Sequence, residues 1–332
     1  MPLPMTPWSW SLMFTTWQSN LGWDVLVVAV FAAYVGGLAV VRRRRTGGLA
    51  WWRIMCMVLG LGALVVTVNS ALETYSHSLF WVHMVQHLLL IMVVPALVIA
   101  GHPLTLLVQV TPARTQRVIR SILSSRAVAV ITHPLVALGL YTVIIVGTHL
   151  TSFMQQMLTH MWLHHLEFVL YLVGGYLFLL PLLGDEPIRW RLPYPARMVV
   201  LFIAMAPDTV VGLVLLQTNH ALFPAYAAMH RAWGPSLVQD IQTGGGIMWV
   251  FGDGLMMCFI VAVMIGYLAN SGHNATAGAW LESVRHNTLV HNLGGVEVGD
   301  GTFTDANADP DDDDATLAAY NEMLRRLKQR DG

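Results

Sequence analysis

The sequence predicts an all-α fold, a polytopic membrane bundle of seven transmembrane helices. Of its 332 residues, 55% are hydrophobic and 11% are charged, whereas soluble domains average roughly 45–50% and 25%. The mean hydropathy is +0.58. The apolar residues also cluster into runs of about 20 residues, the length that crosses a hydrocarbon core of about 30 Å. Because lipid offers backbone groups no hydrogen-bond partner, each run must be helical.

The seven predicted spans form one transmembrane domain, residues 1–269. They cover residues 22–41, 51–70, 79–100, 127–148, 158–183, 197–217 and 245–269. No basic residue precedes Arg42, so the first run is expected to be a retained helix and not a signal peptide. With seven spans, every basic residue except Arg231 falls on one side. The positive-inside rule makes that side cytoplasmic, with the N-terminus outside and the C-terminus cytoplasmic.

Residues 270–332 differ sharply in composition and are predicted to form a cytoplasmic acidic tail. The segment is rich in Gly and Asp and contains four consecutive aspartates at 311–314. Such a composition buries too little apolar surface to fold, so most of the tail is expected to be disordered. Leu317, Tyr320, Leu324 and Leu327 share one helical stripe near its end, which predicts a short amphipathic terminal helix.

Two histidine pairs with the same spacing open the third and fifth predicted spans. His83 and His87 form one pair, and His160 and His164 form the other. Residues four apart lie on one face of a helix. Both helices run inward from the outside, so both pairs are expected within about 10 Å of the outer surface, at matched depth. We predict that these four imidazoles form one metal site, although one such pair alone also fits a hydrogen bond between helices.

Copper, as Cu(I), is the metal that the surrounding residues favour, with zinc as the alternative. Imidazole suits both metals, and thioether sulfur selects Cu(I). The predicted outer half is rich in methionine, although each methionine alone also fits ordinary core packing. Further ligands, or residues that contact the ligands, are expected among Met84, Met161, Glu167, His165, Asp240, Met248 and Asp253.

Acidic residues inside spans are costly in lipid and therefore point to function. Glu167, Asp208 and Asp253 are of this kind, although Asp208 fits equally well a cap for backbone freed by the preceding proline. Glu73, in the first outer loop, is expected to be exposed. The long loop 218–243 is interpreted as a lid over the histidines, and the glycines at 244–246 as a hinge or a point of close backbone approach.

Several motifs resemble the multi-span CtaG-type assembly factors of cytochrome c oxidase. They are the segment 83–90 with Pro95 and the sequence Gly-His-Pro-Leu at 101–104; the stripe of His160, His164 and Glu167 followed by Gly174, Gly175, Pro181 and Leu182; and the late segment 226–253. The tail sequence 319–324 is similar as well. The resemblance covers roughly residues 51–269 and the end of the tail.

The resemblance implies a non-enzymatic, multi-pass protein of the bacterial plasma membrane that helps to assemble a haem–copper oxidase by supplying copper. The implied partners are cytochrome c oxidase subunits or other oxidase assembly factors, within the lipid bilayer. No nucleic-acid partner is expected.

Two other classes of function stay open on the residues alone. One is a seven-span zinc-dependent intramembrane hydrolase with three histidine ligands and a carboxylate base. The other is a haem-b electron carrier with two histidine ligands. A retinal protein is excluded, because the only lysine, Lys328, lies in the tail.

Overall fold

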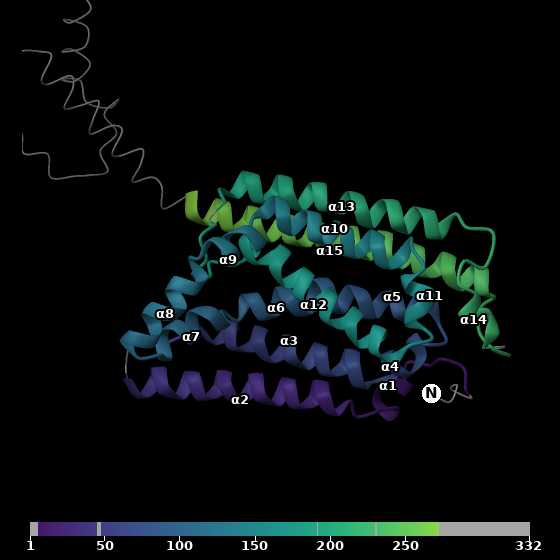
Figure 1. Cartoon of the computed structure of the whole chain (residues 1–332), viewed down its shortest axis with the longest axis horizontal. Coiled ribbons are helices and arrows are strands. Elements are labelled where there is room, and N and C mark those ends of the chain that lie inside the picture. Colours follow the sequence, from purple (N-terminus) through teal and green to yellow (C-terminus); the bar gives the residue numbers. More distant parts are fainter. Residues whose placement is uncertain (1–5, 45–47, 191, 230, 272–332) are drawn as a thin grey trace, which may run out of the picture. The chain divides into compact units, whose positions relative to one another are not determined.

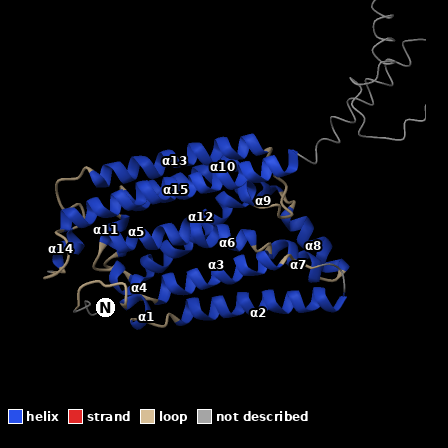
Figure 2. Ribbon diagram, turned by 180° about the vertical axis from the view of Figure 1, so that it is seen from behind, coloured by secondary structure: helices blue, strands red, loops and turns tan. Residues whose placement is uncertain are grey.

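The structure, a computed structural model, describes residues 6–44, 48–190, 192–229 and 231–271. Every regular element in this part of the chain is helical (Figure 2). The elements are α1 Leu12–Thr15, α2 Leu21–Arg44, α3 Trp51–Asn69, α4 Ala71–Ser76, α5 Phe80–Leu88, the π-helix η1 Leu89–Val93, α6 Val94–Ala100, α7 Pro103–Val110, α8 Ala113–Leu123, α9 Arg126–Ile131, α10 Pro134–His149, α11 Phe153–Met157, α12 Met161–Leu183, α13 Tyr194–Leu216, α14 Pro224–Ala228 and α15 Leu237–Ser271.

Six helical stretches are long and apolar enough to cross a membrane, which confirms the all-α membrane class. They are Leu21–Arg44, Trp51–Asn69, Phe80–Val110, Met161–Leu183, Tyr194–Leu216 and Leu237–Ala269. The predicted span 127–148 is instead divided between α9 and α10, because α9 ends at Ile131 and the next helix begins with Pro134 in its first turn. The apolar helix α10 therefore has 16 residues, fewer than the roughly 20 of a typical span.

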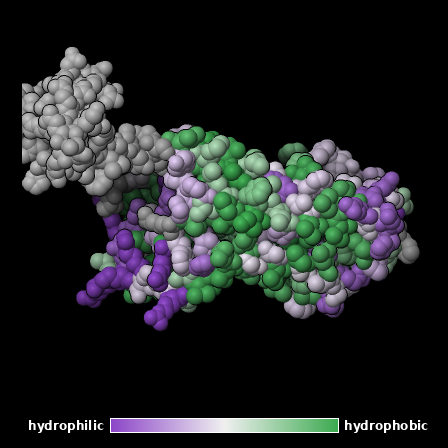
Figure 3. All heavy atoms as spheres, turned by 90° about the horizontal axis from the view of Figure 1, so that it is seen from above, coloured by the Kyte–Doolittle hydropathy of each residue, from purple (hydrophilic) through white to green (hydrophobic). Residues whose placement is uncertain are grey.

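The described residues up to Gly266 form one compact unit. Within this unit the long helices lie side by side, from α2 at one edge through α3, α6 and α12 to α10 and α13 (Figure 1). Apolar residues cover the middle of the face shown in Figure 3, and hydrophilic residues gather at its two ends. The predicted tail, residues 270–332, lies almost entirely outside the described residues.

The stretch Phe80–Val110 and α12 form the centre of this unit. In their most apolar windows 61% and 56% of the residues are buried, compared with 22% in the windows of α2 and α15. A helix that is apolar on all sides and buried belongs in a core. The two histidine-bearing helices are therefore the ones most enclosed by protein.

A proline explains how closely these two helices approach. Pro95 has no N–H to donate to the carbonyl of Ile91 four residues earlier, and the chain widens into the π-helix η1 at this point. Gly175 on α12 lies directly against that carbonyl: a Cβ atom built on Gly175 would be 1.9 Å from the Ile91 oxygen. Only a residue without a side chain fits there. The contact sets the distance between α12 and the chain that follows α5.

The glycines at 244–246 are neither a hinge nor part of a loop, because α15 already begins at Leu237. They pack helix against helix instead. A Cβ atom on Gly245 would be 2.6 Å from the backbone nitrogen of Leu216 and 2.7 Å from the carbonyl oxygen of Gly212, both on α13. The close-approach interpretation of these glycines is thus the correct one. The segment 218–243, expected to be one long loop, is partly helical, because it contains α14 and the first turns of α15.

Candidate metal centre

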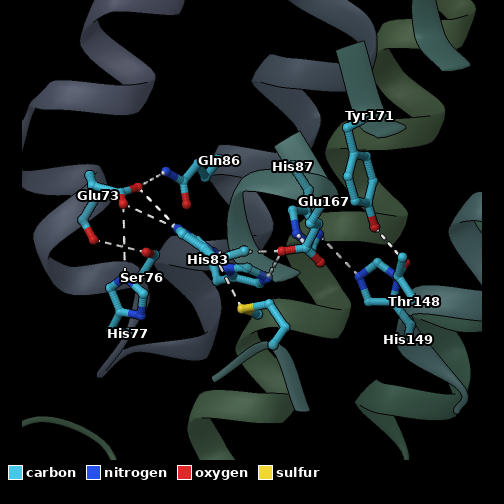
Figure 4. A network of polar contacts seen from close by, with 12 residues as sticks. Glu73, Ser76, His77, His83, Gln86, His87, Thr148, His149, Glu167 and Tyr171 are labelled. Carbon is cyan, nitrogen blue, oxygen red and sulfur yellow. Dashed lines mark hydrogen bonds and ion pairs between the residues drawn. The ribbon is translucent and has the colours of Figure 1, made fainter. Parts of the chain in front are cut away.

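Two groups of three possible metal ligands lie next to each other where α4, α5 and α12 meet (Figure 4). We call His83, His87 and Glu167 the deep group, because all three are buried. We call Glu73, His77 and His164 the shallow group, because His77 is only partly buried. Within each group one ligand atom from each residue lies within 4.8 Å of the other two. Both groups lie at the end of the unit opposite the arginine-bearing helix α8 (Figure 1).

The deep group places a carboxylate between two imidazoles. His83 and His87 lie one turn apart on α5, with ring centroids 4.0 Å apart. Their Nε2 atoms lie 3.5 and 3.2 Å from the two oxygens of Glu167 on α12. No hydrogen bond is formed in any of these contacts: both Glu167 oxygens, both His83 nitrogens and Nε2 of His87 lack a hydrogen-bond partner among the described residues.

Unpaired buried polar atoms are rare in proteins and point to a missing partner. Two imidazole nitrogens and a carboxylate are donors that suit a first-row transition metal. The deep group therefore fits such an ion, since one cation would satisfy its nitrogens and its carboxylate together. Without an ion, the buried Glu167 carboxylate has ion-pair contacts with the two imidazoles but no hydrogen bond, and burying a charge that is not also hydrogen-bonded is costly.

The ring nitrogen of His87 that points away from Glu167, Nδ1, is fixed by hydrogen bonds. Its Nδ1 lies 3.2 Å from Nε2 of His149 on α10, and Nδ1 of His149 lies 2.8 Å from the carbonyl oxygen of Ile145. The His87 ring also stacks on Tyr171, with centroids 4.2 Å apart. Such contacts orient a ligating imidazole and fix which nitrogen carries the proton.

Glu73 is the centre of the shallow group, and the expectation that it is exposed is wrong. The residue is 2% exposed. Nε2 of His164 lies 3.1 Å from its Oε1, and Nε2 of Gln86 donates to its Oε2 at 2.7 Å. Burial alone would raise the pKa of Glu73, but interactions with His164 and His77 outweigh it and hold this pKa below its ordinary value. The side chain is therefore a carboxylate.

The sequence pattern did not reveal Glu73 and His77, because Glu73 lies on a short helix and His77 is the residue that follows it. The six residues of α4 start after Ser70, whose side chain accepts a hydrogen bond from the Leu72 backbone. One and a half turns are too few to show a helical period. The four-residue spacing of Glu73 and His77, just before the pair on α5, is the signal that could have found them.

His160 lies outside both groups, for a local reason. It is the residue before α12 and has an extended backbone, with φ −130° and ψ 107°. The rule that residues four apart share a face holds only within a helix, so His160 does not align with His164. Its exposed ring contacts Thr159 and the carbonyl of Gln156.

The expected methionines are scattered. Met84 is buried on the side of α5 that faces Gly244 on α15, Met161 is 45% exposed, and Met248 is buried in the core. The thioether that lies against a ligand nitrogen is that of Met157, whose Sδ is 3.3 Å from Nδ1 of His164.

The remaining predicted residues have other surroundings. Asp240 accepts hydrogen bonds from the backbone N–H groups of Phe80 and Trp81, each at 3.1 Å, and pairs with Arg231 at 3.2 Å. It therefore caps the start of α5, the helix of His83 and His87. Asp253 accepts a hydrogen bond from Thr209 at 2.7 Å.

Two further residues complete the comparison with the sequence. Asp208 accepts a hydrogen bond from the hydroxyl of Tyr141 on α10. The interpretation of Asp208 as a cap for freed backbone is therefore wrong. His165 is partly buried, and its ring centroid lies 6.2 Å from that of His164, outside both groups.

Comparison with known proteins gives a family match over most of the chain. The family model for the cytochrome c oxidase caa3 assembly factor (Caa3_CtaG) matches residues 32–270. Uncharacterized proteins of Mycobacterium bovis and Mycobacterium tuberculosis are each 28% identical over 98% of this chain, and one of Mycobacterium leprae is 28% identical over 95%. The chain spans about half the length of these relatives, 46%, 46% and 45%. No solved structure matches it.

Proposed function

The chain belongs to the family of cytochrome c oxidase caa3 assembly factors, and from this premise we propose that it supplies copper to a haem–copper oxidase through the deep group. The observation that carries the proposal is the set of unpaired buried atoms of His83, His87 and Glu167. Copper is the cargo in this account. Its donors would be two imidazole nitrogens and one carboxylate oxygen, a set that suits copper and also zinc.

The protein itself would bind and orient the ion. Glu167 supplies negative charge in a setting where burial makes an unbalanced charge costly. His149 and Tyr171 hold the His87 ring in place, and Asp240 fixes the start of α5. The thioether of Met157 lies beside Nδ1 of His164, a residue of the shallow group, and is therefore not counted among the donors of the deep group. The surrounding helices would thus separate the bound ion from the lipid.

We further propose seven crossings, with the N-terminus outside and the C-terminus in the cytoplasm of a bacterium. We count α10, which packs along α12 and α13, as the seventh crossing beside the six long helices. All basic residues except Arg231 then face the cytoplasm. Both ligand groups then lie near the outer surface of the plasma membrane, and the partners are oxidase subunits or other assembly components on that side.

The other two classes of function are less well supported. The family match favours neither the zinc hydrolase nor the haem carrier. The rings of His83 and His87 pack edge to face, and Tyr171 covers His87. The Nε2 atoms of both rings also face the same carboxylate, Glu167, at 3.5 and 3.2 Å, whereas a haem iron with two histidine ligands needs them on opposite sides of its plane.

The proposal is tested in a bacterium that makes a caa3-type oxidase and whose own gene for this assembly factor is deleted. The wild-type chain is expected to restore oxidase activity and the copper content of the purified oxidase. The double variant His83→Ala/His87→Ala is expected to restore less than about a tenth of either, because two of the three ligands of the deep group are lost.

The control is His220→Ala, which removes an exposed imidazole outside both groups; it should restore activity as the wild type does. Equal membrane levels of all three proteins are verified by immunoblot. Full restoration by the double variant would contradict copper supply through the deep group.

A further inference from the structure

We propose that the shallow group is a second copper site and that copper passes from it to the deep group, so that one chain holds two ions in series. The inference rests on the proposed function, because it takes copper as the cargo. It concerns three residues that the sequence pattern did not join: Glu73, His77 and His164. The transfer is an exchange of ligands in which the ion keeps its oxidation state.

The shallow group has the donors and the geometry of a site of its own. Nε2 of His77 lies 3.8 Å from Oε1 of Glu73, and Nε2 of His164 lies 3.1 Å from the same oxygen. Nε2 of His77 is buried and has no hydrogen-bond partner among the described residues. An ion held by these three atoms would give that nitrogen its partner, as in the deep group.

The carboxylate of Glu73 is held in place from behind, as is typical of metal ligands. The side-chain nitrogen of Gln86 donates to Oε2 of Glu73 at 2.7 Å and to the carbonyl oxygen of Thr67 at 2.9 Å. Gln86 thereby binds one carboxylate oxygen and leaves Oε1 directed at the two imidazoles (Figure 4). Since Gln86 lies between His83 and His87 in the sequence, α5 supports both groups.

His164 joins the two groups, because its two ring nitrogens face different ones. Nε2 faces Glu73, whereas Nδ1, which contacts Sδ of Met157 at 3.3 Å, also lies 3.8 Å from Oε2 of Glu167. The ring centroids of His164 and His83 are 6.2 Å apart. An ion that moves between the groups would therefore travel only a few ångströms and remain within reach of ligand atoms. This matters because a bare ion in a low-dielectric interior is very costly.

The order of exposure gives the direction of loading. The side chain of His77 is 15% exposed and that of Glu73 is 3% exposed, whereas those of His164 and Glu167 are fully buried. Solvent therefore reaches the shallow group first. Without an ion, the same contacts would form a network of ion pairs between histidines and carboxylates. The experiment below distinguishes a metal site from such a network.

The test is a count of copper in the purified full-length chain, loaded in separate samples with Cu(I) and with Cu(II) and passed over a desalting column with a weak chelator. Wild type and the control His220→Ala are expected to retain two ions per chain. His77→Ala and the nearly isosteric Glu73→Gln are each expected to retain one, and so is His83→Ala/His87→Ala. In the wild type the two Cu(II) ions should broaden each other's electron paramagnetic resonance signal, and in the single-site variants the broadening should vanish.

Three results would overturn the inference. One ion in the wild type and still one in His77→Ala would show that the shallow group is an ion-pair network, and the proposed function would stand. Loss of both ions in His77→Ala and in Glu73→Gln would show that the groups are not separate sites. No copper in the wild type would remove the proposed function along with the second site.

Discussion

Replacement of Glu167 with glutamine is expected to weaken copper binding by the deep group at least tenfold. Even residues that only contact metal ligands typically change affinity by about 10- to 100-fold, and Glu167 is proposed as a ligand itself. The amide keeps the shape of the side chain but removes the charge that lies 3.2 Å from His87 and 3.5 Å from His83. The measurement is a competition titration of the purified chain against a chelator of known copper affinity.

The matched control for this substitution is Asp208→Asn. Asp208 is also a fully buried carboxylate within a candidate span, but it is bonded to Tyr141 and belongs to neither group. Its replacement should leave the copper affinity within about twofold of the wild type, because Asp208 is bonded to Tyr141 and shares no ligand atom with either group. A Glu167→Gln protein that binds copper as tightly as the wild type would show that the carboxylate only pairs with neighbouring histidines.

Replacement of Gly175 with alanine is expected to lower the unfolding temperature of the protein in detergent by more than about 5 °C. The new methyl group would be 1.9 Å from the carbonyl oxygen of Ile91, which is backbone and cannot rotate away. The helices must therefore separate, and overpacking of this kind typically costs about 1–3 kcal/mol. In domains of about 150–250 residues, about 1 kcal/mol corresponds to roughly 2–4 °C, so a cost at the upper end of that range, as expected for a clash with backbone, gives a shift of more than about 5 °C.

The control for Gly175 is Gly139→Ala on α10, where a built Cβ atom meets nothing within 4 Å. That variant should melt at the temperature of the wild type or slightly above, because alanine favours a helix over glycine. Gly175→Ala should also weaken copper binding, since the same helix contact positions Glu167 opposite α5. Equal unfolding temperatures for the two variants would contradict the role given to the close approach at Ile91.

The sequence predicted the class of fold and the helices that matter most. Long apolar runs require helices in lipid, and five of the seven predicted runs correspond to single long helices of the structure. The run 79–100 became two α-helices around η1, because Pro95 interrupts the regular bonding pattern. The run 127–148 was divided at Pro134, which begins a helix more readily than it continues one.

Part of the site could be predicted from helical periodicity. The rest depends on the tertiary placement of α4 and on the residue at which α12 begins. The spacing of His83 and His87 placed them on one face of α5, and Glu167 was expected within reach of a histidine. The contribution of Glu73 depends on the short helix α4 turning its carboxylate toward α12, a tertiary arrangement that no local pattern encodes. The place of His160 depends on where α12 starts, and element boundaries are the least certain part of a sequence-based prediction.

X-ray absorption at the copper edge of the loaded, purified chain tests the central claim most directly. We expect each copper ion to have nitrogen and oxygen neighbours at about 2 Å, with the multiple-scattering pattern of about two imidazoles per copper. The His83→Ala/His87→Ala variant should hold half as much copper per chain as the wild type, and its remaining ion should still show two imidazoles, those of His77 and His164. Copper that shows no imidazole scattering in the wild type, or a double variant that holds as much copper as the wild type, would contradict copper binding by the deep group.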